Sequence, residues 1–322
     1  MSLRVVMMGT GTFALPAFQA LIASDHDVVG LVTQPDRVGR GHHNHVNEMK
    51  EAAIAGGVEV FQPANVNTEE SLQQLDKFQA DIFVVAAYGQ ILSSELLDLP
   101  RLGAINLHGS LLPKYRGAAP VQFAVLNGET ESGVTIFQIE PKLDAGPILG
   151  VVKTDIGPKE TSGELHDRMA ELSAPLTLEV LDGLESGNIE HLKQEPTEVT
   201  RAPKIRKEHG AIDWSKRSEE LGWHVRGMQP WPMAFTFLHL PEKKSTRILI
   251  LDIVELSEDE TASMQNLQPG ETLQVEKRIF VRTGDGAVDI LKLQPSGKRP
   301  MSAAEFLNGT SVQSGKFGPE NL

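Results

Sequence analysis

Short, almost continuous apolar runs alternate with helical patterns along the first half of the chain. A run such as Ile82–Ala87 has no polar position, which is typical of a strand covered on both faces. The pattern predicts strands at 4–8, 28–32, 58–60, 81–86, 103–108, 133–139 and 148–152, and helices at 14–24, 46–55, 69–78, 119–126 and 164–184. Strand–helix alternation of this kind predicts an α/β fold with a doubly wound, mostly parallel sheet.

The pattern changes after a polar stretch that contains Pro196 and Pro203. A helix follows, with Ser218 as its predicted N-cap and apolar residues on one side. Strand-like runs then lie at 234–238, 247–256, 272–275, 278–283 and 287–293, and Ser302 with Glu305 forms a capping box. A small antiparallel barrel is the economical interpretation. We therefore expect a first domain over 1–189, a linker over 190–208 and a second domain over 209–322.

Composition narrows the class of protein. The 322 residues include no Cys, which excludes disulfides, thiolate nucleophiles and Cys-ligated zinc. No stretch reaches the roughly 18 apolar residues of a membrane helix, and the N-terminus reads as a strand and not as a signal peptide. We expect a cytoplasmic protein with no membrane partner, and a monomer, because no exposed apolar stripe is obvious.

The charge is strongly negative but uneven. The net charge is −13, of which residues 1–206 carry −11 and residues 207–322 carry −2. Nucleic-acid affinity comes largely from Lys and Arg on phosphates, so the total counts mildly against such a partner. Local clusters of basic residues must therefore decide that question.

One motif resembles a dinucleotide fingerprint. Residues Gly9–Ala14 read GTGTFA, match G-x-G-x-x-A, and lie between a predicted strand and a predicted helix, with Asp36 after the second strand. A tight turn that needs small residues explains the same sequence. The motif alone favours the turn.

Asn106 and His108 lie two residues apart on a predicted strand, so their side chains share a face. Carboxyl ends of strands border the ligand crevice in open α/β sheets. An amide donor and a group that titrates near neutrality at such an edge could bind a ligand or take part in a reaction. A hydrogen-bonded Asn–His pair in the core explains the two residues about as well. Asp144, beside the Gly146–Pro147 turn, would add a carboxylate and complete a set suited to acyl transfer.

These residues belong to a longer resemblance. The run from Asn106 and His108 through Ser110–Pro120, followed by Leu143–Gly146, resembles the folate-dependent formyltransferases. Within them, the loop at 34–41 and the runs Ile212–Ser215, Pro230–Pro232 and Leu293–Lys298 resemble the enzymes that act on methionyl-tRNA. The resemblance covers most of the chain. It implies a Rossmann-like formyltransferase fold followed by an OB-like barrel that binds tRNA.

The resemblance implies a reaction and roles for residues. A formyl group would pass from 10-formyltetrahydrofolate, a consumed co-substrate, to the α-amino group of methionyl initiator tRNA, with no metal. Asn106 and His108 would stabilise the oxyanion, and Asp144 would pair with His108, favour its imidazolium form and help take the amine proton. The folate pocket would be lined by Ser110, Leu111, Leu112, Pro113, Leu143, Ala145 and Gly146.

The resemblance also places the tRNA. Arg37 and Arg40 would contact the acceptor stem from the loop 33–50, although a solvated loop is the plainer interpretation of the residues alone. Here the loop continues as His42–His45, where a lysine-rich run is commoner, and a second departure is Gly11 in place of Pro. Metal binding by the His residues is not expected, because they lack metal-ligand spacing. In the linker, Lys204, Arg206 and Lys207 could follow a phosphate backbone.

Three other functions stay open at this stage. The acceptor could be a small amine, such as an amino-sugar nucleotide or glycinamide ribonucleotide. The same triad could release formate to water as a 10-formyltetrahydrofolate hydrolase. A dinucleotide-sensing protein rests on Gly9–Ala14 alone.

Overall fold

The computed structural model describes residues 2–36 and 47–321, which fold into two compact units. Unit 1 comprises residues 1–120, 131–155 and 164–203, and unit 2 comprises residues 121–130, 156–163 and 204–322. Two short segments from the first half of the chain thus belong to unit 2. Each unit is described by itself below.

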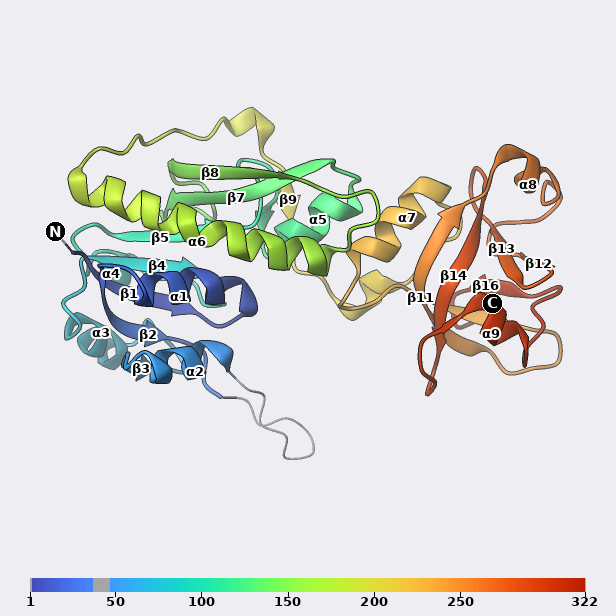
Figure 1. Cartoon of the computed structure of the whole chain (residues 1–322), viewed down its shortest axis with the longest axis horizontal. Helices are drawn as coiled ribbons and strands as arrows, with labels where there is room; N and C mark the ends of the chain where they lie inside the picture. The colour runs from blue at the N-terminus through green and yellow to red at the C-terminus, as the bar shows by residue number, and fades with distance from the viewer. Residues whose placement is uncertain (1, 37–46, 322) are drawn as a thin grey trace. The chain divides into compact units, whose positions relative to one another are not determined.

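Unit 1 is built on a seven-stranded sheet (Figure 1). In sheet order its strands are β3 (Val60–Phe61), β2 (Asp27–Val32), β1 (Arg4–Gly9), β4 (Ile82–Ala86), β5 (Ala104–His108), β7 (Glu131–Gln138) and β8 (Ile148–Asp155). The first five run parallel, and β7 and β8 are antiparallel to their neighbours. The order along the chain reverses at β1, which marks the switch point where such sheets bind ligands. The predicted doubly wound, mostly parallel sheet is confirmed.

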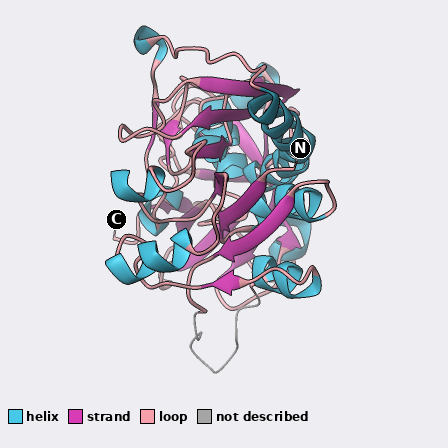
Figure 2. Ribbon diagram, turned by 90° about the vertical axis from the view of Figure 1, so that its left-hand side faces the viewer, coloured by secondary structure: helices cyan, strands magenta, loops and turns pink. Residues whose placement is uncertain are grey.

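Helices cover both faces of this sheet, as the end view shows (Figure 2). Val6 and Met8 of β1 pack on one face with Leu75 and Leu96. On β8, Gly150 lies against Leu176 and Val180 of the long helix. The helices that lie wholly or mostly in unit 1 are η1 (Thr12–Ala14), α1 (Leu15–Ile22), α2 (Glu48–Ala55), α3 (Glu69–Asp76), α4 (Ser94–Leu97), α6 (Ser162–Ser186) and η2 (Pro196–Glu198).

Side-chain caps fix several helix starts. Asn47, Thr68 and Ser93 each accept a hydrogen bond from the backbone N–H three residues later, at the start of α2, α3 and α4. A second, two-stranded sheet joins β6 (Arg116–Gly117) to β9 (Arg201–Ala202) in parallel. This pair fastens residues far apart in the sequence.

Unit 2 contains an antiparallel sheet that almost closes on itself. Its strands are, in order, β12 (Thr272–Val275), β13 (Arg278–Arg282), β14 (Ala287–Pro295), β11 (Thr246–Glu255), β10 (Phe235–His239) and β16 (Lys316–Gly318), and β15 (Met301–Ser302) pairs with β14. A bridge between Glu271 and Lys316 joins the two ends. The predicted barrel is confirmed as this nearly closed sheet.

Four helices and one 3-10 turn in unit 2 complete the described structure: α5 (Pro120–Leu126), η3 (Lys207–Gly210), α7 (Ser218–Gly227), α8 (Glu258–Ala262) and α9 (Ala303–Leu307). The capping box of Ser302 and Glu305 is confirmed at α9. The predicted N-cap at Ser218 is wrong by one residue, because α7 begins at Ser218 itself. The Ser218 hydroxyl instead pairs with the hydroxyl of Thr283.

The Trp of the Ile212–Ser215 run is a core residue. Trp214 stacks on Phe317, with ring centroids 5.6 Å apart, and its indole N–H donates to the Thr236 hydroxyl. Its role in unit 2 is therefore structural. Among residues 2–36 and 47–321, no helix combines the length and apolar character needed to cross a membrane.

Candidate functional site

The candidate site begins at the carboxyl end of β5. Ile105 and Leu107 are buried on one side of the strand, and alternation places Asn106 and His108 on the other. The His108 side chain is almost fully buried, with its ring edge-on to Phe137 at 6.3 Å between centroids. Asn106 stays half-buried.

Both ring nitrogens of His108 face a defined group. Nε2 lies 3.0 Å from the Tyr115 carbonyl, to which it donates. Nδ1 lies 4.0 Å from Oδ2 of Asp144. That separation is longer than a hydrogen bond, as is common in catalytic pairs before a substrate binds. Asp144 is fixed in turn, because its Oδ2 accepts from the Gly117 N–H at 2.7 Å.

Asp144 reaches this place by an indirect path. Strand β7 runs antiparallel to β5, so its end lies beside Ile105, at the start of β5. Residues 139–147 then fold back and bring Asp144 to His108. The structure thus brings two predicted catalytic residues together and places Asn106 on the same strand face.

Burial lowers the pKa of His108 below its ordinary value. The Asp144 carboxylate and the Tyr115 carbonyl act in the opposite direction, and the nearby Arg116 guanidinium adds to the lowering. The Asp144 carboxylate thus favours the imidazolium form, as the sequence predicts, but burial outweighs its effect. A neutral imidazole beside a carboxylate is ready to accept a proton.

Arg116 is a buried cation beside this pair, and sequence reasoning gave it no role. Burial lowers its pKa, and the Asp144 carboxylate opposes that effect. Its guanidinium donates from Nε and Nη2 to Oε1 of Gln194, at 3.1 and 2.6 Å. The signal that could have found it is its place in the Ser110–Pro120 run.

The loop from Ser110 to Pro113 is held by contacts inside unit 1. The Ser110 hydroxyl donates to the Lys114 carbonyl, and the Leu112 N–H donates to the Thr135 hydroxyl. Leu112 packs with Phe137 and Ile148. Ser110, Leu112 and Pro113 are buried and Leu111 is half-buried, so their side chains mainly fix the shape of the loop.

The second predicted folate-binding loop is more open. Leu143 is 57% exposed, and Ala145 is half-buried. Gly146 is buried where no side chain fits, because a Cβ there would lie 1.8 Å from the Gln138 carbonyl oxygen. Ile91, on the loop after β4, is 87% exposed.

The predicted tRNA-binding residues lie elsewhere in the chain. Arg37 and Arg40, together with His42–His45, lie outside the described residues. Lys204, Arg206 and Lys207 are exposed in unit 2, where Arg206 pairs with Glu208 at 3.8 Å. Ile205 between them is buried and anchors the segment.

The dinucleotide look-alike has a packing explanation. A Cβ on Gly9 would lie 2.9 Å from the Ala14 Cβ and 3.0 Å from the Ala86 carbonyl oxygen. Asp36 is held by Lys50 and Gln62, and the hydrogen bond from Lys50 is the main cause that lowers its pKa. Among the described residues, no cluster of three His, Asp or Glu side chains could hold a metal ion.

Comparison with known proteins decides the family. A model described as formyl transferase matches residues 2–181, and a model described as formyl transferase, C-terminal domain matches residues 204–311. A methionyl-tRNA formyltransferase of Methylococcus capsulatus is 41% identical over 98% of this chain and 100% of its own length. One from Desulfotalea psychrophila is 42% identical over 97% of this chain and 94% of its own.

The chain belongs to the methionyl-tRNA formyltransferase family. It is a formyltransferase.

Solved structures agree on the formyltransferase fold. WlaRD, a sugar 3N-formyl transferase, aligns over 93% of this chain and 100% of its own with a TM-score of 0.64 and 18% identity. The Aquifex aeolicus HypX in complex with tetrahydrofolic acid aligns over 95% of this chain and 47% of its own, with a TM-score of 0.59 and 16% identity. At these identities the likeness shows the fold alone.

Proposed function

We propose that this protein transfers the formyl group of 10-formyltetrahydrofolate to the α-amino group of methionyl initiator tRNA. The observation that carries the proposal is the His108–Asp144 pair beside Asn106 at the carboxyl end of β5. The names of the full-length relatives, at 41% and 42% identity, support tRNA as the acceptor. The solved structure of Aquifex aeolicus HypX in complex with tetrahydrofolic acid supports folate as the donor.

His108 and Asp144 would manage the proton of the attacking amine. A neutral His108 can accept this proton, either directly or by way of Asp144. The imidazolium that forms lies 4.0 Å from the carboxylate, which stabilises the new charge. Because Nε2 already donates to Tyr115, Nδ1 is the ring atom that gains the proton.

Asn106 would donate to the oxyanion that develops on the formyl oxygen. Its side chain shares a strand face with His108 and is not fully buried, so a substrate can reach it. One such donor contributes about 3–4 kcal/mol to transition-state stabilisation. His108 would add to this through the positive charge that it gains.

The residues around the site fit a flat, partly apolar donor. Leu143 and Ile91 expose large apolar side chains, while the Ser110–Pro113 loop is held in one shape by Thr135 and Lys114. We infer that Leu143 and Ile91 contact the folate rings, and that Ser110–Pro113, Ala145 and Gly146 form the pocket wall. When bound, the folate would supply the formyl group. As the amine nitrogen bonds to the formyl carbon, the bond between that carbon and the folate nitrogen would break, and the proton taken up by His108 could return to the leaving folate nitrogen.

The acceptor is tested by following a labelled formyl group. We expect label on methionyl initiator tRNA, and its loss with His108→Ala. Label on an amino-sugar nucleotide in place of tRNA would contradict the proposed acceptor. Label released as formate without tRNA would show a 10-formyltetrahydrofolate hydrolase, and NAD binding without folate binding would contradict the enzyme class.

For the tRNA we propose contacts from Arg37 and Arg40 and from the exposed cluster Lys204, Arg206 and Lys207. Reversing the charge of the three cluster residues should raise KM for tRNA and leave folate binding unchanged, because phosphate contacts act through charge. The matched control reverses three exposed lysines outside the cluster, Lys77, Lys277 and Lys292. Equal tRNA kinetics in the two triple variants would contradict the assignment of the cluster.

A further inference from the structure

A segment after the long helix runs across the candidate site. We call residues 192–202 the strap. Leu192 forms an antiparallel bridge with Ile148, and β9 at the other end pairs with β6. The sequence predicts a linker here, yet the strap belongs to unit 1 by its contacts.

Gln194 is the first anchor of the strap. Its Oε1 accepts from Nε and Nη2 of Arg116. Its Nε2 donates to the carbonyls of Asp144 and Gly146, at 2.9 and 2.8 Å. One amide therefore joins the buried cation to the backbone of the loop that carries Asp144.

Thr200 is the second anchor. Its Oγ1 accepts from the Tyr115 N–H at 2.8 Å, and its carbonyl accepts from the Arg116 N–H at 3.0 Å. The approach is close, because a Cβ on Gly117 would lie 2.4 Å from the Ala202 carbonyl oxygen.

The two anchored positions are strained. Tyr115 has φ of 61° and Asp144 has φ of 48°, in the left-handed region that non-glycine residues avoid. Such a conformation is unfavourable and persists only where the surroundings fix it. These two residues also supply the groups that face the ring nitrogens of His108.

We propose that Gln194 and Thr200 are positioning residues, which hold Asp144 and the Tyr115 carbonyl in register with the ring of His108. Gln194 fixes the Asp144 loop through the backbone carbonyls of Asp144 and Gly146, and Thr200 fixes the backbone around Tyr115. The consequence for formyl transfer rests on the proposed function, whereas the consequence for His108 does not.

The test compares Gln194→Ala and Thr200→Val with the conservative Thr200→Ser. The matched control is Thr197→Val in the same strap, because among residues 2–36 and 47–321 the Thr197 hydroxyl bonds only within its own turn, to Glu195. In single-turnover formyl transfer, we expect Gln194→Ala and Thr200→Val to lower the rate constant about tenfold, since small misplacements at a reaction site carry large penalties. Folate and tRNA dissociation constants should change less than about twofold, and Thr200→Ser should restore the rate.

An NMR titration of His108 gives a readout independent of activity. Asp144 raises the pKa of this residue more than Arg116 lowers it, so a loosened Asp144 loop should move the midpoint to lower pH in Gln194→Ala. The midpoint in Thr197→Val should match the wild type.

Two results would overturn the proposal. One is a wild-type His108 titration in a folded Gln194→Ala protein. The other is a loss in affinity for both substrates with no loss in the rate constant. If the wild type transfers no formyl group to tRNA, the proposed function fails, and the His108 titration still decides the positioning role.

Discussion

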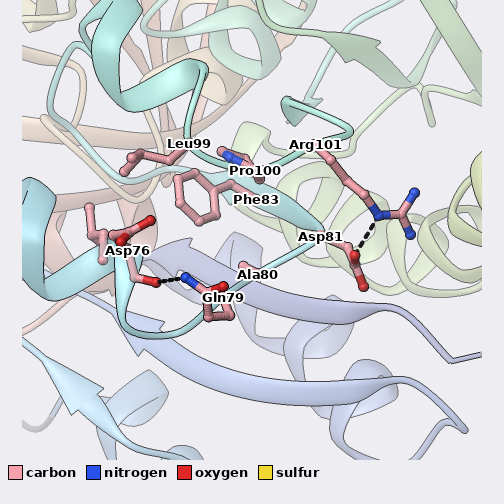
Figure 3. A pocket seen from close by; sticks show the side chains of 9 residues that line it. Asp76, Gln79, Ala80, Asp81, Phe83, Leu99, Pro100 and Arg101 are labelled. Carbon is pink, nitrogen blue, oxygen red and sulfur yellow. Dashed lines mark hydrogen bonds and ion pairs between the residues drawn. The ribbon is translucent and has the colours of Figure 1, made fainter.

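The two edges of the parallel sheet in unit 1 both place a carboxylate near basic side chains, yet they differ in what those groups can do. At the amino edge, Asp81 precedes β4 and lines a cavity of about 270 Å³ with Arg101 and Gln79 (Figure 3). At the carboxyl edge, Asp144 faces His108. The comparison contrasts an ion pair that stabilises the fold, Asp81 with Arg101, with a pair that we propose takes part in the reaction, Asp144 with His108.

At the amino edge, hydrogen-bond donors compensate the negative charge of Asp81. Asp81 accepts from the Arg4 N–H at 2.8 Å and from Nε of Arg101 at 2.6 Å. Burial raises the pKa of Asp81, but these donors outweigh it and hold the pKa below its ordinary value. The carboxylate stays ionised at neutral pH. A hollow lined by such groups does not by itself indicate catalysis.

The carboxyl edge instead holds His108 at the end of β5 and Asp144 on a loop, where its backbone is strained. Burial moves the pKa of His108 below its ordinary value while Asp144 opposes that shift, so the ring can take up a proton when the reaction supplies one. In our proposal, the edge that carries out the reaction is marked by a residue that changes protonation, and not by the size of a cavity.

The largest effect is expected from removing the imidazole. His108→Ala should lower kcat for formyl transfer about a thousandfold, because general acid–base groups contribute 10²–10⁴ in rate. Arg101→Ala removes a charged group from the amino edge and should leave kcat within about twofold of the wild type. Steady-state assays of the two variants test the difference between the two edges. An equal loss of kcat in both variants would contradict it.

A smaller effect is expected from crowding the turn behind Asp144. In Gly146→Ala the new Cβ would meet the Gln138 carbonyl, so the Asp144 loop must shift. We expect kcat to fall about tenfold to a hundredfold and unfolding free energy to drop by about 1–3 kcal/mol. Gly309→Ala is the control, since a Cβ built there would meet no described residue within 4 Å apart from its own chain neighbours. A fully active Gly146→Ala enzyme would show that the loop position does not matter.

The smallest effect concerns stability and pH. An unfolded His binds protons below about pH 6.5, whereas folded His108 resists protonation. Stability of unit 1 should therefore fall as pH drops from 7 to 5, and His108→Gln should flatten this slope. Asp81 has a lowered pKa, so its contribution is lost only below about pH 4. Hydrogen exchange of the β4 and β5 amides at pH 7 and pH 5 measures the His108 contribution, because the Asp81 contribution is unchanged over that range. A slope between pH 7 and pH 5 that is changed by Asp81→Asn but not by His108→Gln would contradict this assignment.

Much of the fold could be predicted because it follows local patterns. The buried run Ile82–Ala86 forms β4, and alternation on β5 put Asn106 and His108 on one face. The capping box at Ser302 was also readable, since both partners lie within four residues. The start of α7 was misjudged because Ser218 bonds to Thr283, a residue remote in the sequence.

The strap could not be predicted, for a physical reason. Gln194 meets Asp144 and Arg116 through hydrogen bonds across 50 and 78 positions, and no periodic pattern signals such contacts. The polar, proline-containing sequence around it favours a loop, which is correct locally, but it gives no information on where that loop packs. The sequence also does not indicate that β7 runs antiparallel to β5, so the approach of Asp144 to His108 could not be predicted either.

The most direct test of the central claim exchanges one oxygen for nitrogen at each edge. Single-turnover transfer of labelled formyl from 10-formyltetrahydrofolate to methionyl initiator tRNA is measured for Asp144→Asn and for Asp81→Asn. We predict that Asp144→Asn lowers the rate constant about a hundredfold or more, while Asp81→Asn keeps it within about twofold of the wild type. Equal rate constants in the two folded variants would contradict the claim that the carboxyl edge performs the chemistry.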